Sequence, residues 1–584
     1  MKKYLYLLLV PILTVVVLGM TVNPYLPYEG DQGGKVAKVV YMVKANTILQ
    51  PLSGPHFYKD ELISFYYLVS AIGYKLIGGD VIHFMNFQSV LMGIVFFTLI
   101  CILLKKAFGV NYLISWAVFI SMPILVITFT YGNEVAFSFT FLTASLLALT
   151  TKFKAHRLIS LILLSASIFS RPDMVFLVPF WIGWFLYFVE SGQTRKETLI
   201  IIAKNTLLLS LFMLIYWALF IHTFKLRSPL SFPYDTNPKL FASYLIYSFN
   251  PTVAFIGILG LLYLIKIDKK LALLVLLSSF PILFYMNKLS CPKYIITFSF
   301  FWGIPATILL QRIKIPYKIS VCALIGIWWL LSFTPYGILG PKNGSFMVIM
   351  THDGPLPTGA YFSFYRKIKE GFFGQTYRDD IDSLKLAIDF MSIQKDAVLI
   401  SNVREYYEYQ LVLNNHYNDI DKWKERWYED SFPIKSDVKY IMIWKYLWFR
   451  RGISDQIKPQ FVQFLKNGQV RNISDSDKSP FPLLIEIGDT VPKGNDPDLA
   501  NRILFMIKYY HGYGIVHSKQ TSDLLRSTYW VEKTAANKQE QSIYTDNQWS
   551  CYSEKVPNSD LWVSEFPVIL YKESRPSKSE ALLD

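Results

Sequence analysis

Residues 1–34 read MKKYLYLLLVPILTVVVLGMTVNPYLPYEGDQGG, and this stretch sets the expectation for the whole chain. Two lysines precede an apolar run that ends near residue 22, and two carboxylates, Glu29 and Asp31, follow among glycines. A helix that crosses a bilayer needs about 20 apolar residues, which this run supplies. It resembles a signal peptide without a small-x-small cleavage site, so we interpret it as a retained anchor. The two acids then lie at the membrane surface, either as a reactive pair or as a charged loop that ends a helix.

Apolar runs of similar length recur as far as about residue 336. The chain of 584 residues is 52% apolar, with a mean hydropathy of +0.31. Measured against the span length, the candidate membrane helices are 4–22, 82–104, 111–130, 134–151, 157–171, 174–190, 198–221, 251–267, 271–287, 294–310 and 318–335. The sequence therefore predicts a polytopic α-helical membrane protein with about 11 transmembrane helices.

The stretch 62–79 is apolar and aromatic but is interrupted by Gly73, Lys75, Gly78 and Gly79. If it does not span, every positively charged short loop falls on one side, as expected for cytoplasmic loops. These loops carry Lys2/Lys3, Lys105/Lys106, Lys152/Lys154/Arg157, Arg195/Lys196, Lys266/Lys269/Lys270 and Arg312/Lys314/Lys318. We therefore expect 62–79 to be a juxtamembrane helix on the outer surface. The N-terminus is then cytoplasmic, and everything after the last span is extracytoplasmic.

The remainder alternates in the manner of an α/β protein. We expect strands at 397–400, 439–444, 483–487 and 568–571, and helices at 384–391, 404–413 and 457–465. The predicted domains are a transmembrane domain over 1–336, whose first outer loop is 23–81, and a soluble extracytoplasmic α/β domain over 337–572. The last residues, 573–584, have the composition of a disordered tail.

Composition excludes several other classes of protein. The formal charge is +15, but much of the Lys and Arg lies in short loops between apolar runs, which favours membrane topology over nucleic-acid binding. The four cysteines form no CxxC pair, and the eight histidines show no metal-ligand spacing. No phosphate-binding loop and no HExxH motif occur.

Ionisable residues gather on the predicted outer face. Placing an ionisable side chain at the edge of a membrane costs free energy, so these residues are functional candidates. The acidic ones are Glu29, Asp31, Asp60, Glu61, Glu134 and Asp173. The basic ones that border spans on this face are Arg171, Lys225, Arg227, Lys288 and Lys293. Simpler interpretations stay open: Glu134 complements a helix dipole, Arg171 and Asp173 form a local ion pair, and the other cations extend to lipid headgroups.

The order of these features resembles the GT-C fold of membrane glycosyltransferases that use polyprenyl-phosphate sugars, such as protein O-mannosyltransferases and the lipid A aminoarabinose transferase. That family has an acidic pair in its first loop, followed by a helix of the pattern x-x-A-x-x-[IVM]. Glu29-Gly30-Asp31 and then Lys35-Val36-Ala37-Lys38-Val39-Val40 match this pattern, although Gly30 separates the acids. Pro55-His56-Phe57 and the 62–79 segment, Glu134, Arg171-Pro172-Asp173 and Lys293-Tyr294 follow in the family's order.

The resemblance implies transfer of a sugar from a polyprenyl phosphate to an acceptor on a glycan, lipid or protein. The phosphate that departs from the donor needs no general acid. A single carboxylate base and inversion at the anomeric carbon are therefore expected. Asp31 is the expected base, with Glu29 as the other choice, and Glu134 is expected on the acceptor or metal side. Lys293, Arg171, Arg227 and Lys288, or a divalent metal such as Mg²⁺ or Mn²⁺, are expected to stabilise the phosphate. Further candidates are His56, Asp60, Glu61, Asp173 and Tyr294.

A different class of function stays open, namely a transporter or flippase of lipid-linked saccharides with a soluble binding module. That class places charged or broken helices near the bilayer midplane. The predicted spans are nearly free of ionisable residues at mid-depth, which favours the enzyme. The absence of a retention signal and the single cysteine of the tail, Cys551, favour a bacterial cytoplasmic membrane.

Overall fold

The structure is a computed structural model of the full chain. It describes residues 2–21, 30–44, 64–151, 155–189, 195–220, 245, 249–280, 296–333, 348–351, 354–357, 397–400, 427–428, 438–443, 446–447, 458–473, 483–509, 514–518, 549–550, 553–559, 561–565 and 568–569. These residues form two compact units. The first unit contains the described residues of 2–21 and 38–333, and the second contains those from 348 onward together with 30–37.

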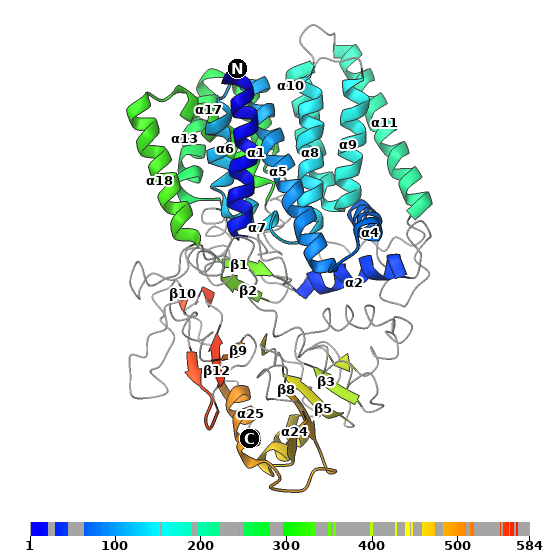
Figure 1. The fold of residues 1–584 in the computed structure, drawn as a ribbon. Helices are drawn as coiled ribbons and strands as arrows, with labels where there is room; N and C mark the ends of the chain where they lie inside the picture. Colours follow the sequence, from blue (N-terminus) through cyan, green and yellow to red (C-terminus); the bar gives the residue numbers. More distant parts are fainter. Residues whose placement is uncertain are drawn as a thin grey trace. The chain divides into compact units, whose positions relative to one another are not determined.

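The first unit is a bundle of helices that stand side by side, with the chain alternating in direction along most of them (Figure 1). Its elements are α1 (Lys2–Thr21), α4 (Phe65–Ile77), α5 (Val81–Phe108), α6 (Tyr112–Ile120), α7 (Pro123–Thr128), α8 (Glu134–Thr150), α9 (His156–Ser170), the 3-10 helix η1 (Pro172–Leu177), α10 (Val178–Val189), α11 (Arg195–Phe220), α13 (Pro251–Ile267), α14 (Lys269–Leu277), α17 (Phe298–Arg312) and α18 (Ile315–Phe333). The helix α2 (Gly30–Lys44) begins in the second unit and ends in the first.

Most of these helices begin and end within a few residues of the predicted apolar runs. Within the described ranges, α5 with 28 residues is the helix whose length and composition suffice to cross a membrane. Shorter apolar helices accompany it, among them α8, α9, α13 and the predicted surface helix α4. The number of membrane spans therefore stays a prediction.

The predicted span 111–130 is wrong as a single helix. The chain forms α6 and α7 instead, and Met122 between them is extended at φ −81° and ψ 106°. The cause is Pro123, which has no N–H to donate and pushes the preceding residue out of the helical region. The turn that follows is buried, since Tyr131 is 4% exposed and Asn133 is 1% exposed.

Serine side chains join α8 and α9 at two levels that lie seven residues apart on each helix. The Ser167 hydroxyl donates to the Ser138 carbonyl oxygen at 2.7 Å, and the Ser145 and Ser160 hydroxyls lie 2.8 Å apart. The Trp181 indole N–H of α10 reaches the Ser145 hydroxyl at 2.9 Å. Small side chains allow two helix backbones to approach closely, and their hydroxyls then bond across the interface. The pairing fixes the register of α8 against α9.

The interface between α13 and α17 depends on two glycines one turn apart. A Cβ atom added at Gly260 would lie 2.4 Å from the Pro305 carbonyl oxygen, and one added at Gly257 would lie 2.9 Å from the Trp302 carbonyl oxygen. No side chain fits at such distances, so the two helices pack with their backbones almost in contact.

The second unit contains a five-stranded sheet in the order β4-β3-β5-β8-β7 and a four-stranded antiparallel sheet in the order β11-β12-β9-β6. In the larger sheet β3 pairs parallel with β4 and β5, whereas β8 pairs antiparallel with β5 and β7. Two short pairs, β1-β2 and β10-β13, are antiparallel.

The strands are β1 (Val348–Thr351), β2 (Gly354–Pro357), β3 (Ala397–Ile400), β4 (Trp427–Tyr428), β5 (Val438–Ile443), β6 (Tyr446–Leu447), β7 (Val470–Asn472), β8 (Leu483–Ile487), β9 (Gly514–Ser518), β10 (Trp549–Ser550), β11 (Ser553–Lys555), β12 (Leu561–Glu565) and β13 (Val568–Ile569). The helices of this unit are α24 (Lys458–Lys466) and α25 (Pro497–Tyr509). Of the predicted elements, β3, β5, β8, β13 and α24 lie where the sequence pattern indicates. The predicted helices 384–391 and 404–413 and the predicted tail 573–584 lie outside the described residues.

Candidate active site

Glu134 is the first residue of α8 and is held there by a rigid turn. Asn133 caps the helix: its side-chain oxygen accepts from the Ala136 N–H at 3.0 Å, and its amide nitrogen donates to the Thr128 and Tyr131 carbonyl oxygens at 2.7 Å each. A carboxylate in the first turn also interacts favourably with the positive end of the helix dipole. Glu134 therefore stands in the first turn of a capped helix, as the simpler interpretation of this residue requires, and its backbone position is fixed.

A second side-chain amide secures this turn from α5. The Asn86 side-chain oxygen accepts from the Gly132 N–H at 2.8 Å, and Asn86 is completely buried. Asn86 was missed by the sequence analysis. The signal was available, because an uncharged polar residue within a predicted span must find a hydrogen-bond partner in the protein.

The helix α4 packs against the start of α8 through aromatic rings. The Tyr66 ring lies 5.1 Å from that of Phe137 in an edge-to-face arrangement, and the Phe65 ring lies 5.7 Å from that of Phe141. Glu134, Phe137 and Phe141 follow at helical spacing and so share one face of α8. The predicted juxtamembrane helix thus contacts the face of α8 that carries Glu134.

Tyr66 brings a buried hydroxyl group to this contact. Its side chain has no exposed surface. Burial and then the charge of Glu134 raise the pKa of Tyr66 well above its ordinary value, while contact with Ser70 lowers it. The Ser70 hydroxyl in turn donates to the Gln88 side-chain oxygen at 2.8 Å, which fastens α4 to α5.

Arg171 and Asp173 lie where α9 gives way to η1, and they form an ion pair. The Arg171 Nε–H donates to an Asp173 carboxylate oxygen at 2.6 Å, and the two side chains are 6% and 18% exposed. The local ion pair considered from the sequence therefore exists. A phosphate-binding role for Arg171 would have to operate with Asp173 already bound at one edge of the guanidinium.

Asp31 lies in the first turn of α2, which begins at Gly30. Later in α2, the Lys38 ammonium lies 5.0 Å from the centre of the Tyr67 ring of α4. Asp31 belongs to the second unit and Glu134 to the first.

The other predicted site residues lie outside the described ranges. They are Glu29, His56, Asp60, Glu61, Arg227, Lys288, Lys293 and Tyr294. Within the described part of the chain, no group of three His, Cys, Asp or Glu side chains could hold a metal ion.

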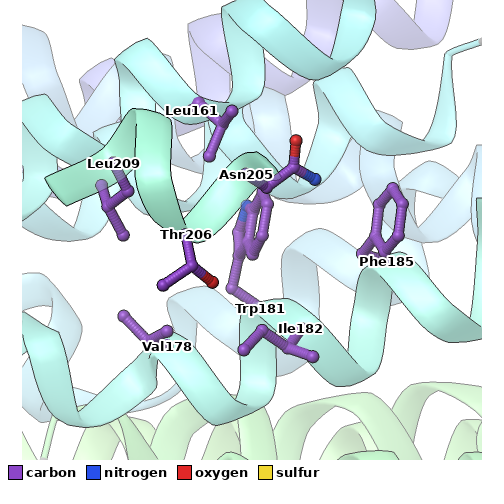
Figure 2. Close-up of a pocket in the computed structure, with 8 residues that line it drawn as sticks. All are labelled: Leu161, Val178, Trp181, Ile182, Phe185, Asn205, Thr206 and Leu209. Atoms are coloured by element: carbon purple, nitrogen blue, oxygen red, sulfur yellow. The ribbon is translucent and has the colours of Figure 1, made fainter. Parts of the chain in front are cut away.

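A separate pocket lies between α9, α10 and α11 (Figure 2), and it contains none of the candidate acids or bases. Its lining is mainly apolar and consists of Leu161, Val178, Trp181, Ile182, Phe185, Asn205, Thr206 and Leu209. Its polar groups are the Asn205 amide and the Thr206 hydroxyl, so it offers a surface for contact but no titratable group for catalysis.

No protein-family model matches the chain, and no curated protein sequence matches it. Among solved structures, the chain is similar to ArnT from Cupriavidus metallidurans bound to undecaprenyl phosphate, with 13% identity, a TM-score of 0.45 and 97% of each chain covered. The same ArnT in its apo state gives 12% identity and a TM-score of 0.45, covering 90% of this chain and 95% of that one.

The oligosaccharyltransferase of Archaeoglobus fulgidus in its apo form gives 11% identity and a TM-score of 0.40, covering 80% of this chain and 71% of that one. With TM-scores of 0.45, 0.45 and 0.40, these likenesses assign no role to any residue of this chain.

Proposed function

We propose that this chain is an integral-membrane glycosyltransferase that moves a sugar from a polyprenyl-phosphate donor to an acceptor hydroxyl or amine on the extracytoplasmic face of a bacterial cytoplasmic membrane. The observation that carries the proposal is the placement of Glu134. A buried amide-capped turn fixes its backbone at the start of α8, on the face that packs against the helix that the sequence predicts to lie along the membrane surface.

Asp31 is the proposed catalytic base. It takes the proton from the acceptor as the acceptor attacks the anomeric carbon from the face opposite the phosphate, so the configuration inverts. Its place in the first turn of α2 supports this choice over Glu29, since a base must stay ionised and the helix N-terminus stabilises the anion. Glu134 orients the acceptor or helps to hold a divalent metal.

The departing phosphate needs compensation for the charge that develops on it. Lys293, Lys288 and Arg227 are the proposed cations, with Arg171 acting beside its partner Asp173, and Mg²⁺ or Mn²⁺ supplies the same positive charge if one is bound. The isoprenoid chain of the donor lies in the bilayer between helices, which accounts for chemistry at the membrane edge.

The alternative function, a transporter or flippase of lipid-linked saccharides, has one observation in its favour. The break between α6 and α7 resembles the discontinuous helices that line transport sites. However, all six residues of α7 are buried, and the Ser121 carbonyl oxygen at the break accepts from the Asn250 amide at 3.3 Å. The break is therefore filled by the protein's own groups, and the enzyme remains the better proposal.

The experiment uses purified full-length protein and a panel of radiolabelled polyprenyl-phosphate sugars, with loss of label from the lipid as the readout. Asp31→Asn is expected to abolish transfer while expression and membrane insertion stay normal. Asp489→Asn is the matched control, because Asp489 is an exposed aspartate in a loop of the second unit. Transfer at the wild-type rate by Asp31→Asn, together with loss of transfer in Glu29→Gln, would move the base to Glu29. Wild-type transfer by both variants would contradict the mechanism.

A further inference from the structure

We propose that the pocket between α9, α10 and α11 binds an anionic phospholipid, with the phosphate at Arg157 and an acyl chain against the apolar part of the lining. Arg157 lies in the first turn of α9, whereas Arg171 directly follows the last turn, so the cation of this pocket is at the opposite end of α9 from the candidate active site. In the proposed topology that end lies in the cytoplasmic leaflet. The proposal does not depend on the glycosyltransferase activity.

The pocket opens on the outer surface of the helix bundle. Leu161, Trp181 and Phe185 form its buried floor, and Thr206 on its rim is exposed. The next residue of α11, Leu207, is 73% exposed although it is apolar. An apolar surface of this kind on a membrane protein is expected to face hydrocarbon. The ligand that reaches this pocket most directly is therefore a lipid.

The chemistry of the lining changes along the pocket. Figure 2 shows Val178 and Leu209 at one end and Phe185 at the other, with the Asn205 amide between them. The Arg157 guanidinium carbon lies 5.7 Å from the centre of the Phe185 ring, so a cation stands at that end. The order is thus apolar side chains, an amide and a cation. A phospholipid has the matching order of acyl chain, ester and phosphate.

Two nitrogen donors at this pocket call for an acceptor. Within the described part of the chain, the Arg157 Nε and the Asn205 amide nitrogen are buried and have no hydrogen-bond partner. The Trp181 indole N–H, by contrast, is used within the protein, because it donates to the Ser145 hydroxyl at 2.9 Å. Buried donors cost free energy unless an acceptor faces them. Phosphate and ester oxygens are acceptors, and a guanidinium group binds phosphate with directed hydrogen bonds.

Charge decides between a phospholipid with an anionic headgroup and other lipids. Basic pockets between membrane helices on the cytoplasmic side bind anionic headgroups. A zwitterionic headgroup would bring its own cation close to Arg157 and so lose part of the attraction. A polyprenyl phosphate carries the right charge, but in the proposed function its phosphate lies at the outer face, at the other end of α9. We therefore assign the pocket to an anionic phospholipid.

The test measures lipid binding to full-length protein that has been purified in detergent and freed of lipid. Radiolabelled phosphatidylglycerol is expected to bind saturably, and phosphatidylcholine with the same acyl chains about tenfold more weakly. Arg157→Gln is expected to raise the Kd for phosphatidylglycerol about tenfold, in keeping with loss of a hydrogen bond to a charged group. Lys204→Gln is the matched control, because Lys204 is an exposed lysine on α11, and its Kd is expected to equal that of wild type.

Asn205→Leu separates binding from folding. It removes an amide whose nitrogen bonds no described protein group, so the Tm without lipid should stay the same or rise, while the Kd for phosphatidylglycerol rises about fivefold. An unchanged Kd with a lower Tm would make the amide a structural group and remove it from the site.

Three results would overturn the proposal. Equal binding of the two phospholipids would exclude recognition of the headgroup. Equal losses in Arg157→Gln and Lys204→Gln would indicate attraction to the general positive charge of the surface. Tighter binding of a polyprenyl phosphate than of phosphatidylglycerol would assign the pocket to the sugar donor. Because none of these measurements needs sugar transfer, their failure is distinct from a failure of the proposed function.

Discussion

Side-chain amides and hydroxyls hold the ends of helices in the first unit where backbone groups lack partners. Asn250 is one such residue. Its backbone is left-handed at φ 67°, and its side chain forms hydrogen bonds with three segments of the chain. Its oxygen caps α13 at the Thr252 N–H at 3.1 Å, while its amide donates to the carbonyl oxygens of Ser121 at 3.3 Å and Ile325 at 3.0 Å. One buried residue thus joins α6, α13 and α18.

A comparable link joins the last turn of α10 to the residue that ends α13. The Tyr187 hydroxyl donates to an Asp268 carboxylate oxygen at 2.5 Å, and the other oxygen caps α14 at the Leu271 N–H. Tyr187→Phe is expected to lower the free energy of unfolding by about 1 kcal/mol, because a partly exposed bond to a charged group is lost. Chemical denaturation in detergent measures this, with Tyr317→Phe as the control, since Tyr317 is 66% exposed on α18.

The effect of Tyr187→Phe is also expected to depend on pH. Burial acts to raise the pKa of Asp268, but the Tyr187 hydroxyl and the backbone N–H groups of α14 lower it below its ordinary value of 3.8. A carboxyl whose pKa is lower in the folded state stabilises the fold above the ordinary pKa and loses that contribution as the pH falls through the folded value. The difference between wild type and variant should therefore be constant above about pH 5 and shrink in stronger acid. A difference that grows in acid would contradict the assignment.

At the scale of elements, the close packing of α13 against α17 requires a residue without a side chain at Gly260. Gly260→Ala places a Cβ atom 2.4 Å from the Pro305 carbonyl oxygen, and backbone cannot move aside as a flexible side chain could. The expected cost is about 1–3 kcal/mol, the range for overpacking in a well-packed interior. Gly326→Ala on α18 is the matched control, because nothing lies within 4 Å of the added atom.

Thermal unfolding of the two glycine variants in one detergent decides this point. Gly260→Ala should unfold at a lower temperature than wild type, and Gly326→Ala at the same or a slightly higher temperature, since alanine is the better helix former. Equal effects of the two substitutions would mean that α13 and α17 do not approach as closely as the structure shows.

At the scale of the whole molecule, the apolar runs predicted the ends of some helices well, because charged or glycine residues end both the run and the helix: α5 ends before Gly109, and α13 ends before Asp268. The prediction of one helix over 111–130 was wrong, because it followed the length of the apolar run, whereas Pro123 divides that run into α6 and α7. The contact between Tyr66 and Phe137 could not be predicted, because it depends on how α4 folds back against α8. Two-thirds of the predicted site residues lie outside the described ranges, so their grouping still rests on motif order.

The predicted sidedness of the molecule can be tested by labelling. In a cysteine-free background, single cysteines at Lys493 and Lys269 place a thiol on exposed positions of the second unit and of the turn between α13 and α14. A membrane-impermeant maleimide added to intact cells is expected to label Lys493→Cys and to leave Lys269→Cys unlabelled until the cells are opened. The reverse pattern would place the acidic first loop in the cytoplasm and contradict the proposed topology.

The break at Ser121 and Met122 has a consequence for how the chain is made. The two pieces have nine and six residues, and at about 1.5 Å per residue neither reaches across a hydrocarbon core about 30 Å thick. Membrane-insertion machinery that selects segments by length and apolar content would retain α5 readily and hold α6 and α7 weakly. In the structure α6 packs against α5 and against α17. It should therefore settle only after α17 has emerged from the ribosome, which makes residues 111–133 a segment whose biogenesis depends on sequence that follows it.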